Sequence, residues 1–441
     1  MSDMFRSLSI FNYRVWASGA IVSNVGSWMQ RTAQDWLVLT QLTHNNATAV
    51  GIVMSLQFGP SILLLPFTGM AADHLDRRKL LMATQGAMGA LALGLGALTI
   101  TGTVQLWQVF VFAFLLGCVT AFDTPARQTF VSDLVPGSNL SNAVALNSTS
   151  FNGARLIGPA VAGVLIAAVG SGWVFLINGL TFSAVLASLT LIRVHELQQR
   201  ERPVRERGSF VQGFRYVWAR PDLKVILLML FLLGTFGMNF PIYLSTMSVS
   251  VFDAGAGAFG VLTSAMAVGS VAGALLAARR ARPKVTLLLV GASIFSISLA
   301  LAAIAPTYLL FAVALVVVGV ASQTLMTTAN STVQLSTDPA MRGRVIAILM
   351  AVIMGGTPIG APIVGWVANA YGPREAIALG AFAGLMSACV GAFYLVKYHH
   401  LRVHFDGWRP RITQHEPDHI TAMFDSVTPE QAPDTNATSR V

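Results

Sequence analysis

The chain has 441 residues, of which 54% are hydrophobic and only 11% are charged, whereas soluble domains carry about 25% charged residues. This composition excludes an ordinary soluble enzyme, and it excludes a disordered chain, which needs low hydrophobicity and high charge. The net charge of +9 would fit a nucleic-acid partner, but the placement of the basic residues gives it another meaning.

Twelve apolar runs of membrane-crossing length follow one another along the chain. A spanning helix needs about 20 apolar residues. No small-residue cleavage site precedes the first run, which itself holds polar residues, so we expect a retained helix rather than a signal peptide. The runs are roughly 15–40, 48–71, 80–101, 105–122, 142–169, 173–193, 223–247, 257–278, 285–304, 307–326, 345–369 and 375–397.

The basic residues fall on one side of the expected membrane. If the N-terminus is cytoplasmic, every Lys and Arg lies in a cytoplasmic segment except Arg31 and Arg155, inside spans, and Arg374, in an outer loop. Basic loops stay on the cytoplasmic side of a membrane. The positive charge therefore indicates orientation, with both termini cytoplasmic, and not a nucleic-acid partner.

One long polar connector divides the runs into two groups of six. Its first part is charged, and its second part is amphipathic at helical spacing, which is typical of a helix on a membrane surface. Gly163 in the fifth run matches Gly365 in the eleventh, and neighbouring glycines repeat at the same offset. Two such halves around a central site are the plan of a transporter. The expected units are a six-helix bundle at 1–193, a linker at 194–222, a second bundle at 223–397 and a polar cytoplasmic tail at 398–441.

Asp35 is the only carboxylate that we expect deep within a span. A charge near the bilayer centre costs about 2.5–3.5 kcal/mol on insertion scales, so such a group is a functional candidate. Arg31 lies one turn earlier on the same helix face, and Arg155 is the other cation expected inside a span. A carboxylate that alternates between apolar surroundings and a neighbouring cation can take up and release a proton. A static Asp35–Arg31 pair is the alternative.

Polar and aromatic residues from several runs are expected to line a substrate cavity around Asp35. Aromatic and amide side chains with few charges favour amphipathic organic molecules over sugars or phosphates, although such residues also form hydrogen bonds between helices. The expected lining residues are Asn24, Trp28, Gln34, Gln57, Phe58, Asn147, Asn152, Asn239, Phe240, Tyr243 and Gln323.

The segment between the second and third runs, residues 69–79, reads GMAADHLDRRK. It resembles the signature loop of the major facilitator superfamily, G-x-x-x-D-R-x-G-R-R/K, with His74 and Asp76 in place of an Arg and a Gly. The resemblance implies twelve transmembrane helices in two pseudo-symmetric six-helix halves, latched together by this loop in the outward-facing state. Basic charge that only sets topology is the alternative. The implied latch residues are Gly69, Asp73, Arg77 and Arg78.

Further segments resemble the enterobactin-exporter and drug:proton antiporter-3 branch of that superfamily. They include SNVGSWMQ at 23–30, AFDTPAR at 121–127 and NGARLIGP at 152–159. Gly158, Pro159 and Gly163 are also similar to the helix-five antiporter motif associated with export, although a purely structural kink is the alternative. The resemblance implies a secondary transporter that exports small amphipathic, drug- or siderophore-like compounds in exchange for protons by alternating access.

No arrangement typical of an enzyme is present in the expected spans, so we expect no enzymatic activity, no cofactor and no metal. A G-x-G-x-x-G match at 255–260 has no preceding strand, and an H-E-x-x-H match at 415–419 contains Pro417, which breaks a helix. The expected partners are a small-molecule substrate, protons and the lipid bilayer of the cell membrane, with a monomeric chain and no nucleic acid. Metabolite uptake by the same fold and a non-transporting membrane sensor are the alternatives.

Overall fold

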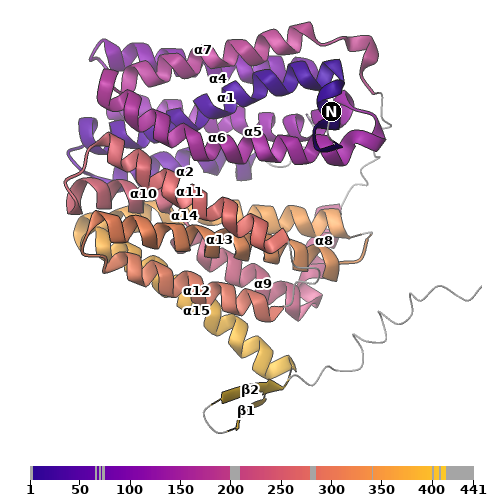
Figure 1. The fold of residues 1–441 in the computed structure, drawn as a ribbon, viewed down its shortest axis with the longest axis vertical. Helices are drawn as coiled ribbons and strands as arrows, with labels where there is room; N and C mark the ends of the chain where they lie inside the picture. The colour runs from indigo at the N-terminus through magenta and orange to yellow at the C-terminus, as the bar shows by residue number, and fades with distance from the viewer. Residues whose placement is uncertain are drawn as a thin grey trace, which may run out of the picture.

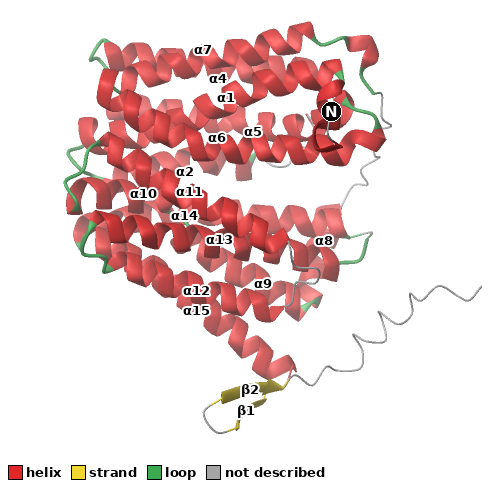
Figure 2. Ribbon diagram, in the orientation of Figure 1, coloured by secondary structure: helices red, strands yellow, loops and turns green. Residues whose placement is uncertain are grey.

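The computed structural model describes residues 3–64, 67–68, 71, 75–198, 209–278, 285–339, 341–399, 402–406 and 409–413. Within these residues the chain forms two bundles of long helices that lie side by side, the first half above the second in Figure 1. Figure 2 shows that the loops between the long helices gather at the two ends of the bundles. The first half contains α1 (Phe11–Trp36), α2 (Ala47–Leu63), α4 (Arg77–Ile100), α5 (Leu106–Leu134), α6 (Leu140–Val169) and α7 (Ser171–Leu191).

The short helix α8 (Ser209–Ala219) precedes the second half and lies at the end of the molecule where the N-terminus is found (Figure 1). Its first membrane crossing, Pro221–Val251, is broken into α-helical and π-helical pieces around Asn239. The helices are α8 (Ser209–Ala219), α9 (Pro221–Leu232), α10 (Phe240–Thr246), α11 (Ala256–Ala278), α12 (Val285–Ala303), α13 (Tyr308–Ser336), α14 (Arg342–Ala370) and α15 (Pro373–His399).

Ten helical segments of the described residues are long and apolar enough to cross a membrane. Two more helices complete the set: α1, which carries charged and amide side chains, and α2, whose described part has 17 residues. The prediction of an all-helical membrane protein with twelve spanning helices in two halves is thereby confirmed. The hairpin of β1 (Arg402–Asp406) and β2 (Arg409–Thr413) was not predicted, because its residues lie in the segment expected to be a polar tail.

Capping side chains explain where several helices begin. Asn46 accepts a hydrogen bond from the Ala49 amide at the start of α2, and Asp76 accepts one from the Lys79 amide at the start of α4. Each bond satisfies a backbone donor that has no partner within its helix. Polar residues at the ends of the apolar runs therefore set the boundaries of these spans.

The amphipathic half of the predicted linker is the helix α8. Its Phe214 and Trp218 rings stack at 5.4 Å on an exposed face, whereas Val217 is buried. Gly213 lies close to α14, since a Cβ there would be 2.9 Å from the Arg344 Cβ. The position of α8 on a membrane surface, and the predicted boundaries of the four units, stay predictions.

Glycines bring the two halves together along two helix pairs, α2 with α14 and α6 with α11. A Cβ on Gly163 of α6 would lie 2.7 Å from the carbonyl oxygen of Ala256, and one on Gly260 of α11 would lie 2.5 Å from that of Pro159. Small residues permit this close backbone approach between membrane helices. These approaches lie in the part of α6 and α11 remote from the N-terminus, so the halves are closed at that end.

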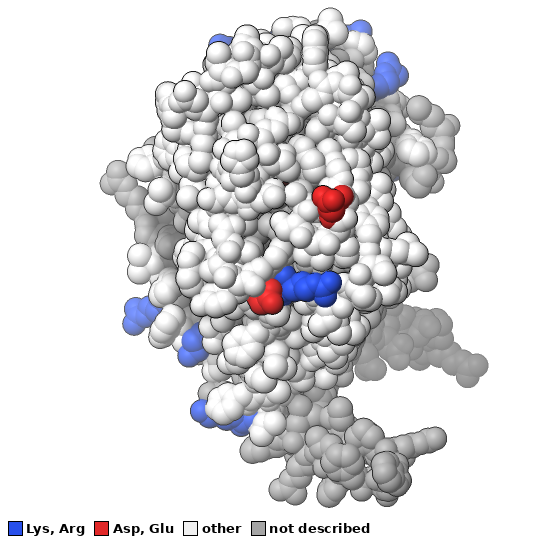
Figure 3. Space-filling model, turned by 90° about the vertical axis from the view of Figure 1, so that its left-hand side faces the viewer, with Lys and Arg blue, Asp and Glu red and all other residues white. Residues whose placement is uncertain are grey.

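A hydrogen-bonded cluster reinforces the closed end, and we call it the Asn369 clasp. The Ala47 amide donates to the Asn369 side-chain oxygen at 2.8 Å, and the Asn369 amide nitrogen donates to Asn46 at 2.6 Å and to Thr48 at 2.8 Å. The clasp joins the start of α2 to the end of α14. The face of the molecule at this end is almost free of charged side chains (Figure 3), which supports the predicted cytoplasmic position of the opposite end.

Candidate functional site

A cavity of about 190 Å³ lies between the two halves and is lined by both. Its charged side chains all come from the first half, and the second half contributes apolar side chains and two threonines. The lining residues of the first half are Trp28, Arg31, Thr32, Asp35, Met54, Gln57, Phe58, Arg155 and Pro159. Those of the second half are Met238, Phe240, Pro241, Leu244, Phe259, Thr263, Met266, Ala267 and Thr357.

The three groups predicted to couple transport to protons meet in this cavity. Arg31 and Asp35 are one turn apart on α1, so both face the same side of that helix. Arg155 reaches the cavity from α6, which packs tightly on α1 because a Cβ at Gly158 would lie 2.6 Å from the Trp28 Cβ. The charge of Arg31 interacts electrostatically with those of Asp35 and Arg155. Their role in coupling stays a prediction.

Aromatic rings hold both guanidinium groups. The Arg31 guanidinium carbon lies 5.2 Å from the centre of the Trp28 ring and 5.6 Å from that of Phe58. The Arg155 guanidinium lies 5.6 Å from the same Trp28 ring, whose edge is in turn fixed by Phe151. Such cation–π contacts contribute about 0.5–2 kcal/mol each, and they restrain both side chains without occupying their N–H groups.

Within the described residues, Arg31 and Asp35 form no ion pair within 4.0 Å, and neither arginine of the cavity donates a hydrogen bond. The alternative of a static Asp35–Arg31 pair therefore has no direct contact to support it in this state. Asp35 lines the cavity, and among the described residues it forms no hydrogen bond and no ion pair.

Four of the predicted lining residues line the cavity: Trp28, Gln57, Phe58 and Phe240. Asn24 instead accepts a hydrogen bond from Arg127, and the Asn239 amide donates to the Thr235 carbonyl oxygen. The lining includes none of the other predicted residues among those that the structure describes. Gln34 is buried, Asn147 is half-buried on α6, Asn152 donates to the Ser148 carbonyl, Tyr243 donates to the Phe236 carbonyl, and Gln323 donates to Thr327.

The described latch residues form bonds inside the first half. Arg77 donates to both carboxylate oxygens of Asp133 on α5, at 2.7 and 2.9 Å, and Arg78 donates to the Leu189 carbonyl on α7 at 2.6 Å. Gly69 and Asp73 lie outside the described residues. A latch between the halves stays a prediction for the opposite state.

The sequence interpretation missed a buried carboxylate and its hydrogen-bonded partners on α5. Asp123 of α5 is 3% exposed and accepts hydrogen bonds from Thr84, Gln85 and Arg127. The expectation that Asp35 alone lies deep within a span stays a prediction, whereas Asp123 and Arg127, expected beyond the end of the fourth apolar run, are helical. The reason is that α5 continues to Leu134, well past the apolar run that was expected to end at 122.

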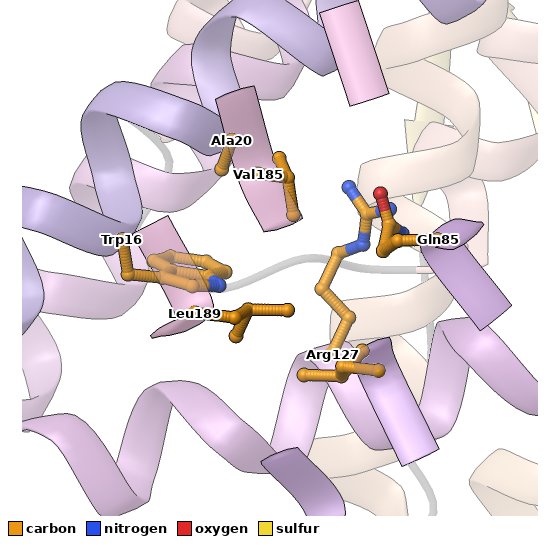
Figure 4. A pocket seen from close by; sticks show the side chains of 7 residues that line it. Trp16, Ala20, Gln85, Arg127, Val185 and Leu189 are labelled. Atoms are coloured by element: carbon orange, nitrogen blue, oxygen red, sulfur yellow. The ribbon is translucent and has the colours of Figure 1, made fainter. Parts of the chain in front are cut away.

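This network serves to join helices. Figure 4 shows the Arg127 side chain beside Gln85, at a small hollow of about 10 Å³ walled by Trp16 and Leu189. A space of that size holds at most about one water molecule. Asp123, Arg127 and their partners therefore connect α1, α4 and α5, and the central cavity is the candidate site.

Known proteins resemble this chain over most of its length. A family model described as a transmembrane secretion effector matches residues 4–407. The staphyloferrin A transporter of Staphylococcus aureus is 25% identical over 389 residues, which are 86% of this chain and 95% of that protein. The enterobactin exporter EntS of Escherichia coli K12 is 25% identical over 373 residues, which are 83% of this chain and 88% of the relative.

Solved structures show the same fold. A bacterial homologue of the human lysosomal transporter Spinster, inward-facing and unoccupied, has a TM-score of 0.65 at 14% identity and covers 88% of this chain and 97% of its own. A POT family transporter in complex with 5-aminolevulinic acid has a TM-score of 0.70 at 12% identity, with coverage of 87% and 95%.

Proposed function

The chain belongs to the transmembrane secretion effector family of the major facilitator superfamily, and from its cavity we propose that it exports small amphipathic, siderophore- or drug-like compounds in exchange for protons. It is a multi-pass membrane transporter, and we place it in the cell membrane. The observation that carries the proposal is the position of Asp35, a carboxylate without an ion-pair partner in a cavity between the two halves. Relatives named for staphyloferrin A and enterobactin support a siderophore-like cargo.

The way the halves meet supports alternating access. Here α2 and α14 are joined at the Asn369 clasp, so with cytoplasmic termini the outer end of the molecule is the closed one. Rocking of the halves about the cavity would break the clasp and open that end. Asp35 would take up a proton while the cavity faces outward and release it while the cavity faces inward.

Proteoliposomes containing the full chain test the exchange. The internal pH would be followed with a trapped dye while enterobactin is supplied on one side, with a pH gradient imposed in either direction. Exchange predicts that cargo moves against the proton flow, and that Asp35→Asn abolishes gradient-driven accumulation.

The matched control is Asp253→Asn. Asp253 is an acidic residue of a loop outside the cavity, and its positive φ of 47° is a conformation that Asn tolerates. If Asp35→Asn accumulates cargo as well as the Asp253→Asn control does, Asp35 is not the proton carrier and the proposal fails.

A second candidate, uptake together with protons, is favoured by the two guanidinium groups of the cavity. If the cargo is an acid, its negative charge and that of ionised Asp35 repel each other, so cargo and proton bind together. Binding of the cargo together with a proton is the behaviour of a cotransporter. In the same proteoliposomes, cargo moving in the direction of the proton flow selects this mode over exchange.

A further inference from the structure

Two arginines of the cavity have hydrogen-bond donors to spare. A guanidinium presents five N–H donors and has no acceptor. Within the described residues, no hydrogen bond from Arg31 or Arg155 to the protein is formed, and no carboxylate lies within 4.0 Å of either. Because buried N–H donors without an acceptor are costly, a ligand that supplies acceptor atoms to these two side chains is favoured.

The aromatic contacts place both arginines beside the same ring. Arg31 comes from α1 and Arg155 from α6, yet both guanidinium groups lie within 5.6 Å of the centre of the Trp28 ring. Both side chains also line the same cavity, and planar guanidinium groups match the two oxygen atoms of a carboxylate in a bidentate manner.

The charge balance of the cavity selects the sign of its ligand. Arg31 and Arg155 outnumber Asp35, the one acidic side chain of the lining. The net charge of the lining is therefore positive when Asp35 is ionised and more positive when it is protonated. A cationic cargo would add a further positive charge, whereas an anion would neutralise the excess.

We propose that Arg31 and Arg155 bind the acidic group of the cargo, so that the transported compounds are water-soluble organic anions with an apolar or aromatic body. This rests on the proposed transport function, and by the linkage given above an anionic cargo favours its second mode, cotransport with protons. The opposite wall suits the body of such a ligand, because Phe240, Leu244 and Phe259 line it from the second half.

Three ligands with one body and different charges test the sign. Equilibrium binding to the full chain in detergent or nanodiscs, at neutral pH and without any gradient, would be measured for 2-naphthoate, 2-naphthamide and 2-naphthylmethylamine. The expected order is naphthoate first, amide at least about tenfold weaker, and amine weakest, since charged hydrogen bonds are worth about 1.5–3 kcal/mol. An amide or amine that binds as tightly as naphthoate overturns the proposal.

Substitutions in the cavity test where the anion binds. Arg31→Gln and Arg155→Gln should each weaken naphthoate binding at least about tenfold, while Arg215→Gln, on the exposed face of α8, should leave it unchanged. Asp35→Asn should bind naphthoate several-fold more tightly, because it removes a negative charge from the cavity. A gain of affinity cannot arise from misfolding. Unchanged affinity in both arginine variants, or no gain in Asp35→Asn, refutes the assignment.

A phosphate headgroup from the bilayer offers the same acceptor oxygens as a carboxylate. One part of the experiment therefore distinguishes a lipid ligand from a soluble acid. Short-chain phosphatidic acid would be added as a competitor. Displacement of naphthoate only by naphthoate-like acids supports the proposal, whereas binding of phosphatidic acid with no binding of naphthoate refutes it in favour of a lipid. Naphthoate binding without transport would contradict the transport function and leave the anion site standing.

Discussion

The contact between α2 and α14 offers a direct test of how the halves close. At Gly51, a Cβ would lie 2.7 Å from the carbonyl carbon of Ala361, 2.9 Å from the Cα of Pro362, and closer still to the Ala361 oxygen. All three atoms are backbone and cannot rotate away. With carbon–carbon contacts normally at about 3.5–4.0 Å, Gly51→Ala requires the two helices to separate by about 1 Å.

The energetic cost follows from that clash. Overpacking a tight contact costs about 1–3 kcal/mol, and the cost falls only on the state in which α2 and α14 touch at this end. The opposite state, in which the Asn369 clasp is broken, does not incur it. A difference of that size changes the ratio of the two states by about 5- to 150-fold.

Cysteine labelling measures the change. In a chain with Cys118 and Cys389 replaced by serine, Thr263→Cys places a thiol on the cavity wall. A membrane-impermeant maleimide, added from the side of the Asn369 clasp, reacts only when that end opens. Gly51→Ala should raise the labelling rate about fivefold or more.

The matched control lies on the same helix. Gly59 is also in α2, but a Cβ there would meet nothing within 4 Å. Gly59→Ala should therefore label at the parent rate. If the two alanine variants label equally, the α2–α14 contact does not hold this end closed, and the reading of the structure as one end-state of a rocking cycle is wrong.

Three further changes have defined outcomes. Asp123→Asn removes the carboxylate charge that pairs with Arg127 and should lower the free energy of unfolding by about 3–5 kcal/mol. This loss would be measured as a lower melting temperature of the purified protein. Asn369→Ala removes exposed hydrogen bonds worth about 0.5–1.5 kcal/mol each, so it should raise cysteine labelling from the clasp side in the same assay. Gly158→Ala should push α6 from α1 and weaken naphthoate binding, whereas Gly153→Ala, with open space around it, should not.

The fold was accessible from the sequence because the bilayer constrains it strongly. Length, hydropathy and the placement of Lys and Arg fix the number and order of spans. The ends of the helices were harder to predict from the sequence. The helix α5 continues through Asp123 and Arg127 to Leu134 because neighbouring helices satisfy those charges, and an apolar run cannot reveal such partners.

The site was only partly accessible, for a related reason. A charge inside a span is unusual in itself, so Asp35, Arg31 and Arg155 could be singled out. The rotation of each helix could not be predicted, and Asn239, an equally polar residue, instead donates a hydrogen bond to the Thr235 carbonyl of the same crossing. Apart from Phe240, the apolar wall was missed, since Leu244 or Met266 on a cavity wall has the same sequence signature as one in the core.

The division of charge between the halves bears on the transport cycle. Arg31, Asp35 and Arg155 all belong to the first half, and the second half contributes no charged side chain to the described lining. The halves can therefore rock apart without breaking an ion pair across the cavity, which would cost several kcal/mol in a low-dielectric site. The three charges keep their arrangement on α1 and α6, and what changes between the states is the water and the ligand that reach them. Selectivity would then reside in the first half, and the moving wall of the second half would set the size of the cargo's body.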